Sequence, residues 1–244
     1  FGRQRVLRGV RRELQRGKPT VVLGPSGTGK SVLLKHIVGL IRPDRGEVYF
    51  EQQRVDAMGE KQLVEVRRKF GFLFQMAALF DSMDVEANVC FPLMEHTDMD
   101  ADERRERCRK GLRVVGLDGV QKKMPADLSG GQRKRVALAR AIVLEPDVVL
   151  YDEPTTGLDP IRADLINELI LSLNKELGIT GVVVTHDMAS ANKVADRLVM
   201  LSDGQVVADG EPKAFTQSDN PVVQRFIHGQ ADAEDLEQIR KGFD

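Results

Sequence analysis

The chain has 244 residues, 41% hydrophobic and 30% charged, and its 36 Lys and Arg against 37 Asp and Glu leave a formal net charge of −1. This balance is typical of a globular protein with one large domain or two small ones, and it offers no basic excess for a nucleic-acid backbone. The sequence contains no stretch of about 18 apolar residues, which is the length that a helix needs to span a bilayer. Cys90 and Cys108 show no partner pattern, which argues against a disulfide scaffold or a zinc cluster and fits a reducing cytoplasm.

Strand and helix patterns alternate along most of the chain, which predicts an α/β protein with a parallel sheet. Short, wholly apolar runs are typical of strands that are buried on both faces. A helix is predicted over 29–40, where apolar residues recur at helical spacing, and 197–208 is predicted to form a hairpin around Asp203-Gly204. The predicted strands before this hairpin are 18–24, 47–51, 70–74, 148–151 and 181–185.

Helical patterns replace strand patterns between residues 76 and 146, which predicts a helical subdomain inserted in the α/β core. Its helix at 101–115 carries five basic residues that could contact nucleic acid or form a solvated face. The interleaved acidic residues favour the solvated face. After a domain spanning 1–218, we predict a helical, acidic extension over 219–244, which is either a weakly packed tail or a docking helix.

A phosphate-binding loop is predicted at residues 24–31, between a strand and a helix. Its glycines let backbone N–H groups surround a phosphate, and the helix N-terminus adds partial positive charge. Lys30 is expected to contact the β- and γ-phosphates, the Ser31 hydroxyl to bind Mg²⁺, and Val32 to complete the nucleotide-binding segment. The motif G-x-x-x-x-G-K-[ST] is matched by Gly24-Pro25-Ser26-Gly27-Thr28-Gly29-Lys30-Ser31.

Polar residues follow three of the predicted strands, at the edge where ligands bind in open α/β sheets. Asp152 and Glu153 follow one strand, Gln75 another and His186 a third. We expect Asp152 to hold Mg²⁺ through water and Glu153 to act as general base. Gln75 is expected to contact the metal or the attacking water, and His186 to sense the γ-phosphate. The alternative is a turn with solvated acids and a structural histidine.

A second anion site is predicted just before an amphipathic helix at 133–144. Ser129 is a good N-cap, and the glycines after it leave backbone N–H groups open. The alternative is an ordinary capped helix start. We call this pentapeptide the signature segment: Leu128-Ser129-Gly130-Gly131-Gln132.

The order of these motifs resembles the nucleotide-binding domain of ABC transporters over residues 1–218. The resemblance implies the ABC-ATPase fold, a P-loop NTPase with a RecA-like parallel-sheet core, an antiparallel β part and an inserted helical subdomain. It also implies ATP and Mg²⁺ as cofactors, with ATP hydrolysis coupled to transport. The motifs that carry it are the phosphate loop, Gln75, the signature segment, Asp152-Glu153, Gly157-Leu158-Asp159 and His186.

The same resemblance implies a head-to-tail homodimer with shared ATP sites. The signature segment of one subunit would contact the γ-phosphate of its partner's ATP, through Ser129, Gly131 and Gln132 with Gly130 beside them. Asp159 would lie across the interface, near the opposite phosphate loop. The family places an aromatic residue upstream of this loop to stack on adenine, and Phe1 is the residue at about the right place.

The segment 76–83, from Met76 to Met83, is apolar and follows the Gln75 loop, which in this family faces the membrane subunit. Exposed apolar patches mark interfaces, and Met suits an adaptable groove, although burial in the helical subdomain is the alternative. The string 74–83, followed by 88–89 and 91–96, resembles the ATPases of Mla-type and Mce-associated lipid transporters, and 24–35 agrees with them. That resemblance implies a membrane permease and an Mce-type lipid-binding protein as partners, without nucleic acid. It places the chain peripherally on the cytoplasmic side of the bacterial inner membrane.

Other functions remain as alternatives: an ABC ATPase for another cargo, such as polar amino acids, or a non-transport ABC ATPase. Non-transport members in DNA repair carry a long coiled coil, and those in translation carry two cassettes, whereas this sequence has no heptad insert and a single set of motifs. A GTPase is disfavoured, because the guanine motif Asn-Lys-x-Asp fails at Ala195 in Asn192-Lys193-Val194-Ala195.

Overall fold

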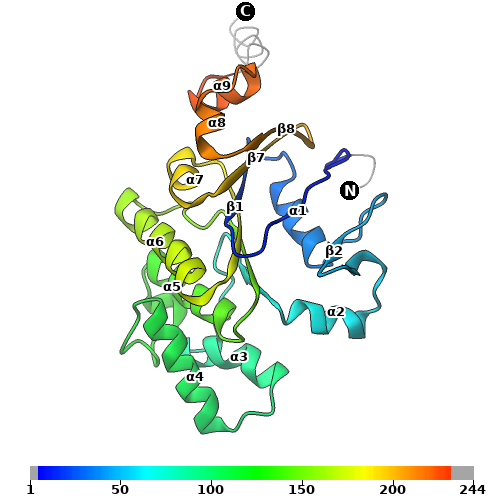
Figure 1. Cartoon of the computed structure of the whole chain (residues 1–244). Helices are drawn as coiled ribbons and strands as arrows, with labels where there is room; N and C mark the ends of the chain where they lie inside the picture. The colour runs from blue at the N-terminus through cyan, green and yellow to red at the C-terminus, as the bar shows by residue number, and fades with distance from the viewer. Residues whose placement is uncertain (1–4, 232–244) are drawn as a thin grey trace, which may run out of the picture.

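A six-stranded sheet runs through the centre of the computed structural model, which describes residues 5–231 (Figure 1). The strand order is β4-β5-β6-β1-β7-β8; the first five are parallel, and β8 is antiparallel to β7. The predicted α/β class and the hairpin of β7 with β8 are therefore confirmed. The strands are β1 (Thr20–Leu23), β4 (Phe70–Leu73), β5 (Val148–Asp152), β6 (Thr180–Thr185), β7 (Arg197–Ser202) and β8 (Gln205–Gly210).

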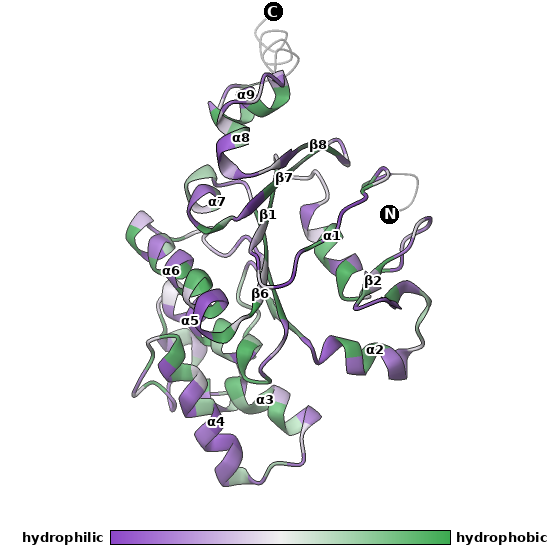
Figure 2. Ribbon diagram, in the orientation of Figure 1, coloured by the Kyte–Doolittle hydropathy of each residue, from purple (hydrophilic) through white to green (hydrophobic). Residues whose placement is uncertain are grey.

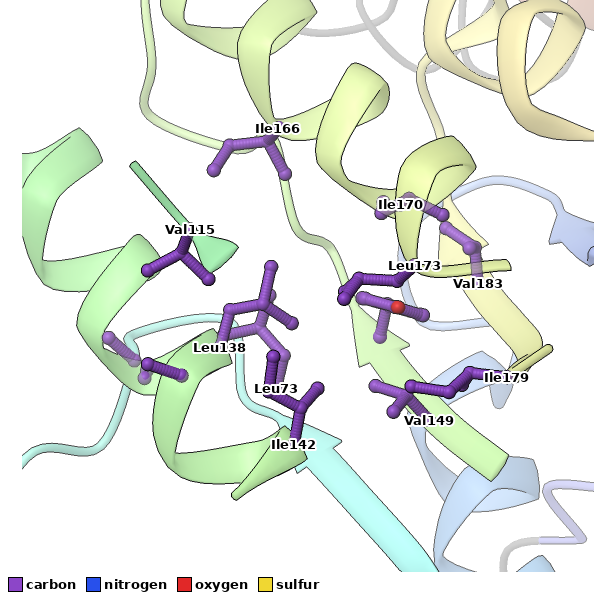
Figure 3. Close-up of a cluster of buried hydrophobic side chains, with 14 of the residues drawn as sticks. Leu73, Val115, Leu138, Ile142, Val149, Ile166, Ile170, Leu173, Ile179 and Val183 are labelled. Atoms are coloured by element: carbon purple, nitrogen blue, oxygen red, sulfur yellow. The ribbon is translucent and has the colours of Figure 1, made fainter. Parts of the chain in front are cut away.

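Alternate side chains of each central strand enter two different cores. In β5, Val149 and Tyr151 pack into the larger core, whereas Leu150 packs into the smaller one on the opposite face. The larger core lies against α5 (Gly130–Ile142) and α6 (Pro160–Leu177), as Figure 3 shows for Leu138 and Ile170. The smaller core lies against α1 (Lys30–Ile37). Burial on both faces explains why these strands read as unbroken apolar runs.

The predicted strand at 47–51 is shorter than expected and folds back on itself. The chain forms β2 (Tyr49–Phe50), which pairs antiparallel with β3 (Gln53–Arg54). The reversal lies at Glu51 and Gln52, whose φ angles of 47° and 66° are in the left-handed region. A short 3₁₀ helix (Val55–Ala57) and α2 (Glu60–Arg67) follow and enclose a small apolar cluster.

Between residues 76 and 146, the described elements are all helical: α3 (Val85–His96), α4 (Ala101–Val114), a 3₁₀ turn (Pro125–Asp127) and α5. α3 and α4 lie at one end of the molecule, and α5 lies between them and the sheet (Figure 1). Asp100 caps α4 in a reciprocal arrangement with Glu103. Basic residues of α4 pair with acidic residues of the same helix, among them Arg113 with Glu106 at 2.9 Å. Figure 2 shows the hydrophilic colouring of α4, which favours the solvated-face interpretation.

The interpretation of the two cysteines as unpaired is wrong in this structure. Cys90 of α3 and Cys108 of α4 form a disulfide, with their Cα atoms 5.7 Å apart. The two helices pack against each other, and both cysteines lie in the larger core. Sequence spacing cannot show this pairing, because the packing of α3 on α4 brings together residues that are 18 positions apart.

Three short helices complete the described chain: α7 (Met188–Val194), α8 (Pro212–Thr216) and α9 (Pro221–Ile227). Asn220 caps α9, and Val223 is buried in the larger core. Part of the predicted extension is therefore helical and packed, whereas residues 232–244 lie outside the described range. Within residues 5–231, no helix is long and apolar enough to cross a membrane.

The packing around α6 gives a prediction about stability. Ile170→Ala removes a side chain that is 1% exposed, so it is expected to destabilise the fold by about 2–5 kcal/mol through lost burial and a residual cavity. Ile161→Ala, on the same helix but 83% exposed, is the control and should change stability by no more than about 0.5 kcal/mol. Urea unfolding followed by circular dichroism measures both. Equal effects of the two variants would contradict the described core.

Candidate active site

The phosphate loop connects β1 to α1 and is held closely against its neighbours. Gly24 has a φ of 150°, and a Cβ at this position would collide with the backbone oxygen of Leu201. Gly29 has a φ of 96°, and a Cβ there would press on Val6 and Leu7. Glycine is therefore required for the path of the loop. α1 begins directly afterwards, at Lys30.

Lys30 is buried and reaches back across the loop that precedes it. Its Nζ donates to the backbone oxygens of Gly24, at 2.8 Å, and Pro25, at 3.0 Å. The same atom lies 3.8 Å from Oε1 of Glu153. Burial lowers the pKa of Lys30, and the nearby carboxylates of Glu153 and Asp152 oppose that shift. The amine is therefore positioned where a phosphate bound in the loop would meet it.

Ser31 and Asp152 form an oxygen pair beside Lys30. The Ser31 hydroxyl donates to Oδ1 of Asp152 at 2.7 Å. Burial raises the pKa of the Asp152 carboxyl, and the hydrogen bond from Ser31 counteracts this shift. A hydroxyl and a carboxylate in contact are hard oxygen donors of the kind that Mg²⁺ prefers. The donor set therefore fits the predicted magnesium site.

Glu153 lies at the exit of β5, where its side chain is surrounded by donors. Nδ1 of His186 is 2.9 Å from Oε2 of Glu153. The Thr156 hydroxyl donates to the same oxygen at 3.1 Å, and that of Thr185 at 3.4 Å. Glu153 has a φ of 48°, a left-handed conformation that is uncommon for a residue with a side chain and typical of functional sites.

The structure thus brings together five of the residues predicted for the site: Lys30, Ser31, Asp152, Glu153 and His186. Gln75 follows the end of β4 and is exposed, and no hydrogen bond links its side chain to these residues among those described. Phe1 lies outside the described residues. The roles of Gln75 and Phe1 therefore stay predictions.

Ser129 is the N-cap of α5, as predicted, but the helix spans Gly130–Ile142 and so begins and ends earlier than the predicted 133–144. The Ser129 hydroxyl accepts from the Gln132 backbone N–H at 3.3 Å, and the Gln132 side chain accepts from the Ser129 N–H at 2.9 Å. Gly130 and Gly131 pack near Leu158 and Arg162. Asp159 caps α6 by accepting from the Arg162 N–H at 3.0 Å. Within residues 5–231, no hydrogen bond joins the signature segment to the phosphate loop of the same chain.

Lys134 is a neighbour of the site that sequence reasoning missed. It is only 6% exposed, and its Nζ donates to the backbone oxygens of Glu153, at 3.1 Å, and Pro154, at 2.7 Å. The sequence did hold a signal for it. Lys134 stands at helical spacing from Ala137 and Leu138, so a lysine occupies the apolar face of an amphipathic helix.

A phosphate loop between a strand and a helix, facing two carboxylates at the end of a parallel strand, defines a P-loop nucleotide-hydrolysing protein. The family model described as "ABC transporter" matches residues 7–156. The chain therefore belongs to the ABC transporter family and carries its ATPase cassette. The predicted resemblance and fold class are confirmed.

The chain is also similar to individual ATP-binding proteins of named transport systems. Over 217 residues, the chain is 45% identical to the intermembrane phospholipid transport system ATP-binding protein MlaF of Escherichia coli, covering 89% of this chain and 81% of MlaF. Over 229 residues, it is 43% identical to the probable ribonucleotide transport ATP-binding protein mkl of Mycobacterium leprae, covering 94% of this chain. The chain spans 66% of the length of that relative.

A solved structure of an ATP-binding cassette also matches this chain. The dimeric post-hydrolysis structure of the ATP-binding cassette MJ0796, bound to ADP and Pi, superposes with a TM-score of 0.79 at 36% identity. The match covers 85% of this chain and 90% of that one. This similarity agrees with the nucleotide-site assignment that the geometry gives.

Lys30 provides a test of that assignment. Lys30→Gln keeps most of the side-chain length but removes the charge, so ATP affinity is expected to fall about 10- to 100-fold, the value of a charged hydrogen bond. Titration with a fluorescent ATP analogue in Mg²⁺ buffer measures the change. Lys61→Gln on α2 is the control and should bind like the parent. Unchanged affinity in Lys30→Gln would contradict the phosphate site.

Proposed function

We propose that this protein binds and hydrolyses ATP to drive lipid transport, with phospholipid as the cargo, through a separate membrane permease. The observation that carries the proposal is the assembled site, in which Lys30, Ser31, Asp152 and Glu153 meet at one edge of the sheet. The identity of 45% to a protein named for intermembrane phospholipid transport supports the cargo.

In this proposal, the phosphate loop binds the triphosphate through its backbone N–H groups and Lys30. Ser31 and Asp152, the latter through water, hold Mg²⁺, with Gln75 as a further contact. The ion neutralises phosphate charge when it is bound. Glu153 accepts the proton of the attacking water, and His186, whose Nδ1 lies 2.9 Å from Oε2 of Glu153, senses the γ-phosphate.

A homodimer completes the two ATP sites. Ser129 and the glycines after it present the start of a 13-residue helix, and a helix N-terminus attracts phosphate. In the proposed head-to-tail arrangement, this helix start faces the partner's nucleotide and Asp159 faces the partner's phosphate loop. The MJ0796 cassette, which is 36% identical and was solved as a dimer with ADP and Pi, supports a dimer of this chain.

The permease is proposed to dock on the segment 76–83. Met76 is 87% exposed and Phe80 41% exposed, whereas Ala77 is buried at 3%. The segment is therefore anchored at Ala77 and by Leu79, which packs against the larger core, and it presents Met76 and Phe80 to solvent. Arg140 of α5 fixes it further by donating to the Ala77 oxygen at 3.0 Å. An exposed apolar surface on a fixed loop supports a protein interface.

An Mce-type lipid-binding protein belongs to the same assembly, and the chain lies on the cytoplasmic side of the bacterial inner membrane. The cassette extends over 1–218, with the helical subdomain at 76–146, and a helical extension follows over 219–244. The helix α9, which is capped by Asn220, supports the start of that extension.

Another cargo is the second candidate, because the mkl relative is named for ribonucleotide transport. The test purifies the tagged chain with its membrane partner and places the complex in liposomes. ATP-dependent movement of a fluorescent phospholipid, absent with Glu153→Gln, is the expected result. ATP-dependent movement of a labelled ribonucleotide, without phospholipid movement, would overturn the phospholipid cargo.

Glu153 gives a prediction about hydrolysis. Glu153→Gln removes the general base but keeps the shape of the side chain, so kcat should fall about 10²- to 10⁴-fold while ATP binding persists. ATP should then accumulate in a stable dimer, which light scattering with size exclusion detects as a doubled mass. Glu168→Gln on α6, at an exposed position, is the control. Near-normal turnover in Glu153→Gln would reject the assignment.

Met76 gives a prediction about assembly. Met76→Asp places a charge on the exposed docking segment, so the amount of co-purified permease should fall about 10-fold or more. The ATPase rate of the isolated chain should stay within about 2-fold of the parent, since the Met76 side chain is 87% exposed and its loss removes little packing. Leu177→Asp, at a 52% exposed position on α6, is the control. Unimpaired co-purification of Met76→Asp would contradict this surface.

A further inference from the structure

The backbone at Glu153 is held in an unfavourable conformation. A φ of 48° is unfavourable for a residue with a side chain and persists only where its surroundings fix it. Three contacts do so here. The Glu153 N–H donates to the Val184 oxygen at 2.9 Å, the Thr156 N–H donates to the Glu153 oxygen at 3.3 Å, and Lys134 donates to that same oxygen.

Lys134 is the contact that comes from another layer of the fold. Its stem crosses the packed face of α5, and its Nζ reaches the consecutive carbonyl oxygens of Glu153 and Pro154. No carboxylate within residues 5–231 forms an ion pair with this amine. Burial lowers the pKa of Lys134 to about 8, and the nearby Glu153 carboxylate opposes that shift. Most of the amine is therefore charged at pH 7, which strengthens its bonds to the two carbonyls.

We propose that Lys134 is a positioning residue that fixes the backbone of Glu153, and so ties the catalytic carboxylate of one ATP site to the helix whose first turn serves the partner's ATP. The inference rests on the proposed function, because it takes Glu153 as the general base and Ser129 as the contact to the partner's nucleotide. It predicts that losing the amine impairs turnover rather than nucleotide binding.

The first test uses the full-length homodimer. Lys134→Met keeps the apolar stem but leaves both carbonyls without a donor, so kcat is expected to fall 10-fold or more, with KM and ATP affinity within 2-fold. Lys134→Arg restores a charged donor and should recover kcat to within 3-fold of the parent. An unchanged kcat in Lys134→Met, or equal losses in the Met and Arg variants, would overturn the proposal.

Arg135 provides a matched control on the same helix. It also donates to two consecutive backbone oxygens, those of Val115 and Gly116, but these follow α4 and not the catalytic strand. Arg135→Met should lower the melting temperature about as much as Lys134→Met while leaving kcat within 2-fold. A parallel loss of kcat in Arg135→Met would show that general damage to α5, and not the position of Glu153, explains the effect.

Mixed dimers, prepared with two affinity tags, locate the effect. Ser129→Arg on one subunit is expected to disable the ATP site of its partner, so the one working site uses the Glu153 of the variant subunit. When that subunit also carries Lys134→Met, this Glu153 lacks its amine, and turnover should fall. When the two changes lie on different subunits, the working site keeps its own Lys134, and turnover should match the dimer with Ser129→Arg alone. The reverse pattern would mean that Lys134 acts through its own signature segment, and would overturn the proposal.

The parent and Glu153→Gln, run in the same assay, show whether a failed test concerns the role of Lys134 alone or the proposed general base as well. If the parent hydrolyses ATP and Glu153→Gln does not, an intact rate in Lys134→Met refutes the role of Lys134 alone. If Glu153→Gln retains turnover, the proposed general base is wrong, and the role of Lys134 is refuted with it.

Discussion

The structure depends on a cluster of charges that is buried at the carboxyl edge of the sheet. Asp152 and Glu153 are each 8% exposed, and Lys30 is 6% exposed. Burying an unpaired charge costs several kcal/mol, so each group must find partners. Lys30 meets two carbonyls and Glu153, Asp152 meets Ser31, and Glu153 meets His186. These contacts require β1, β5 and β6 to end at the same level.

Parallel pairing is what makes the strands end together. β5 and β1 flank β6 in register, with Asp152 opposite Val184 and Leu23 opposite Thr185. The phosphate loop, the two acids and His186 therefore leave the sheet at adjacent points. Both cores serve this arrangement, because a strand that is packed on two faces cannot shift its register without exposing apolar side chains. Fold stability and site geometry thus depend on the same interactions.

The sequence predicted most of the sheet and most of the site residues, because the patterns that indicate them are local. Wholly apolar runs marked β1, β4, β5 and β6, and the residues that follow those runs identified most of the site. The reversal at Glu51 and Gln52 is a local turn, and it was missed because no glycine, proline or asparagine marks it. The Cys90–Cys108 pair and the position of Lys134 were missed because they depend on contacts between distant segments. A lysine on an apolar helix face was the one local sign of such a contact.

α5 connects the parts of the molecule that the proposed function needs. At its start, Ser129 caps the helix that is proposed to face the partner. In its second turn, Lys134 donates to the carbonyls of Glu153 and Pro154. Near its end, Arg140 donates to Ala77 and lies over the ring of Phe80 at 5.8 Å. A 13-residue helix is about 20 Å long. Lys134 joins this helix to the end of β5 at a point between Ser129 and Arg140, so the signature segment, the backbone of Glu153 and the segment 76–83 are all attached to one helix.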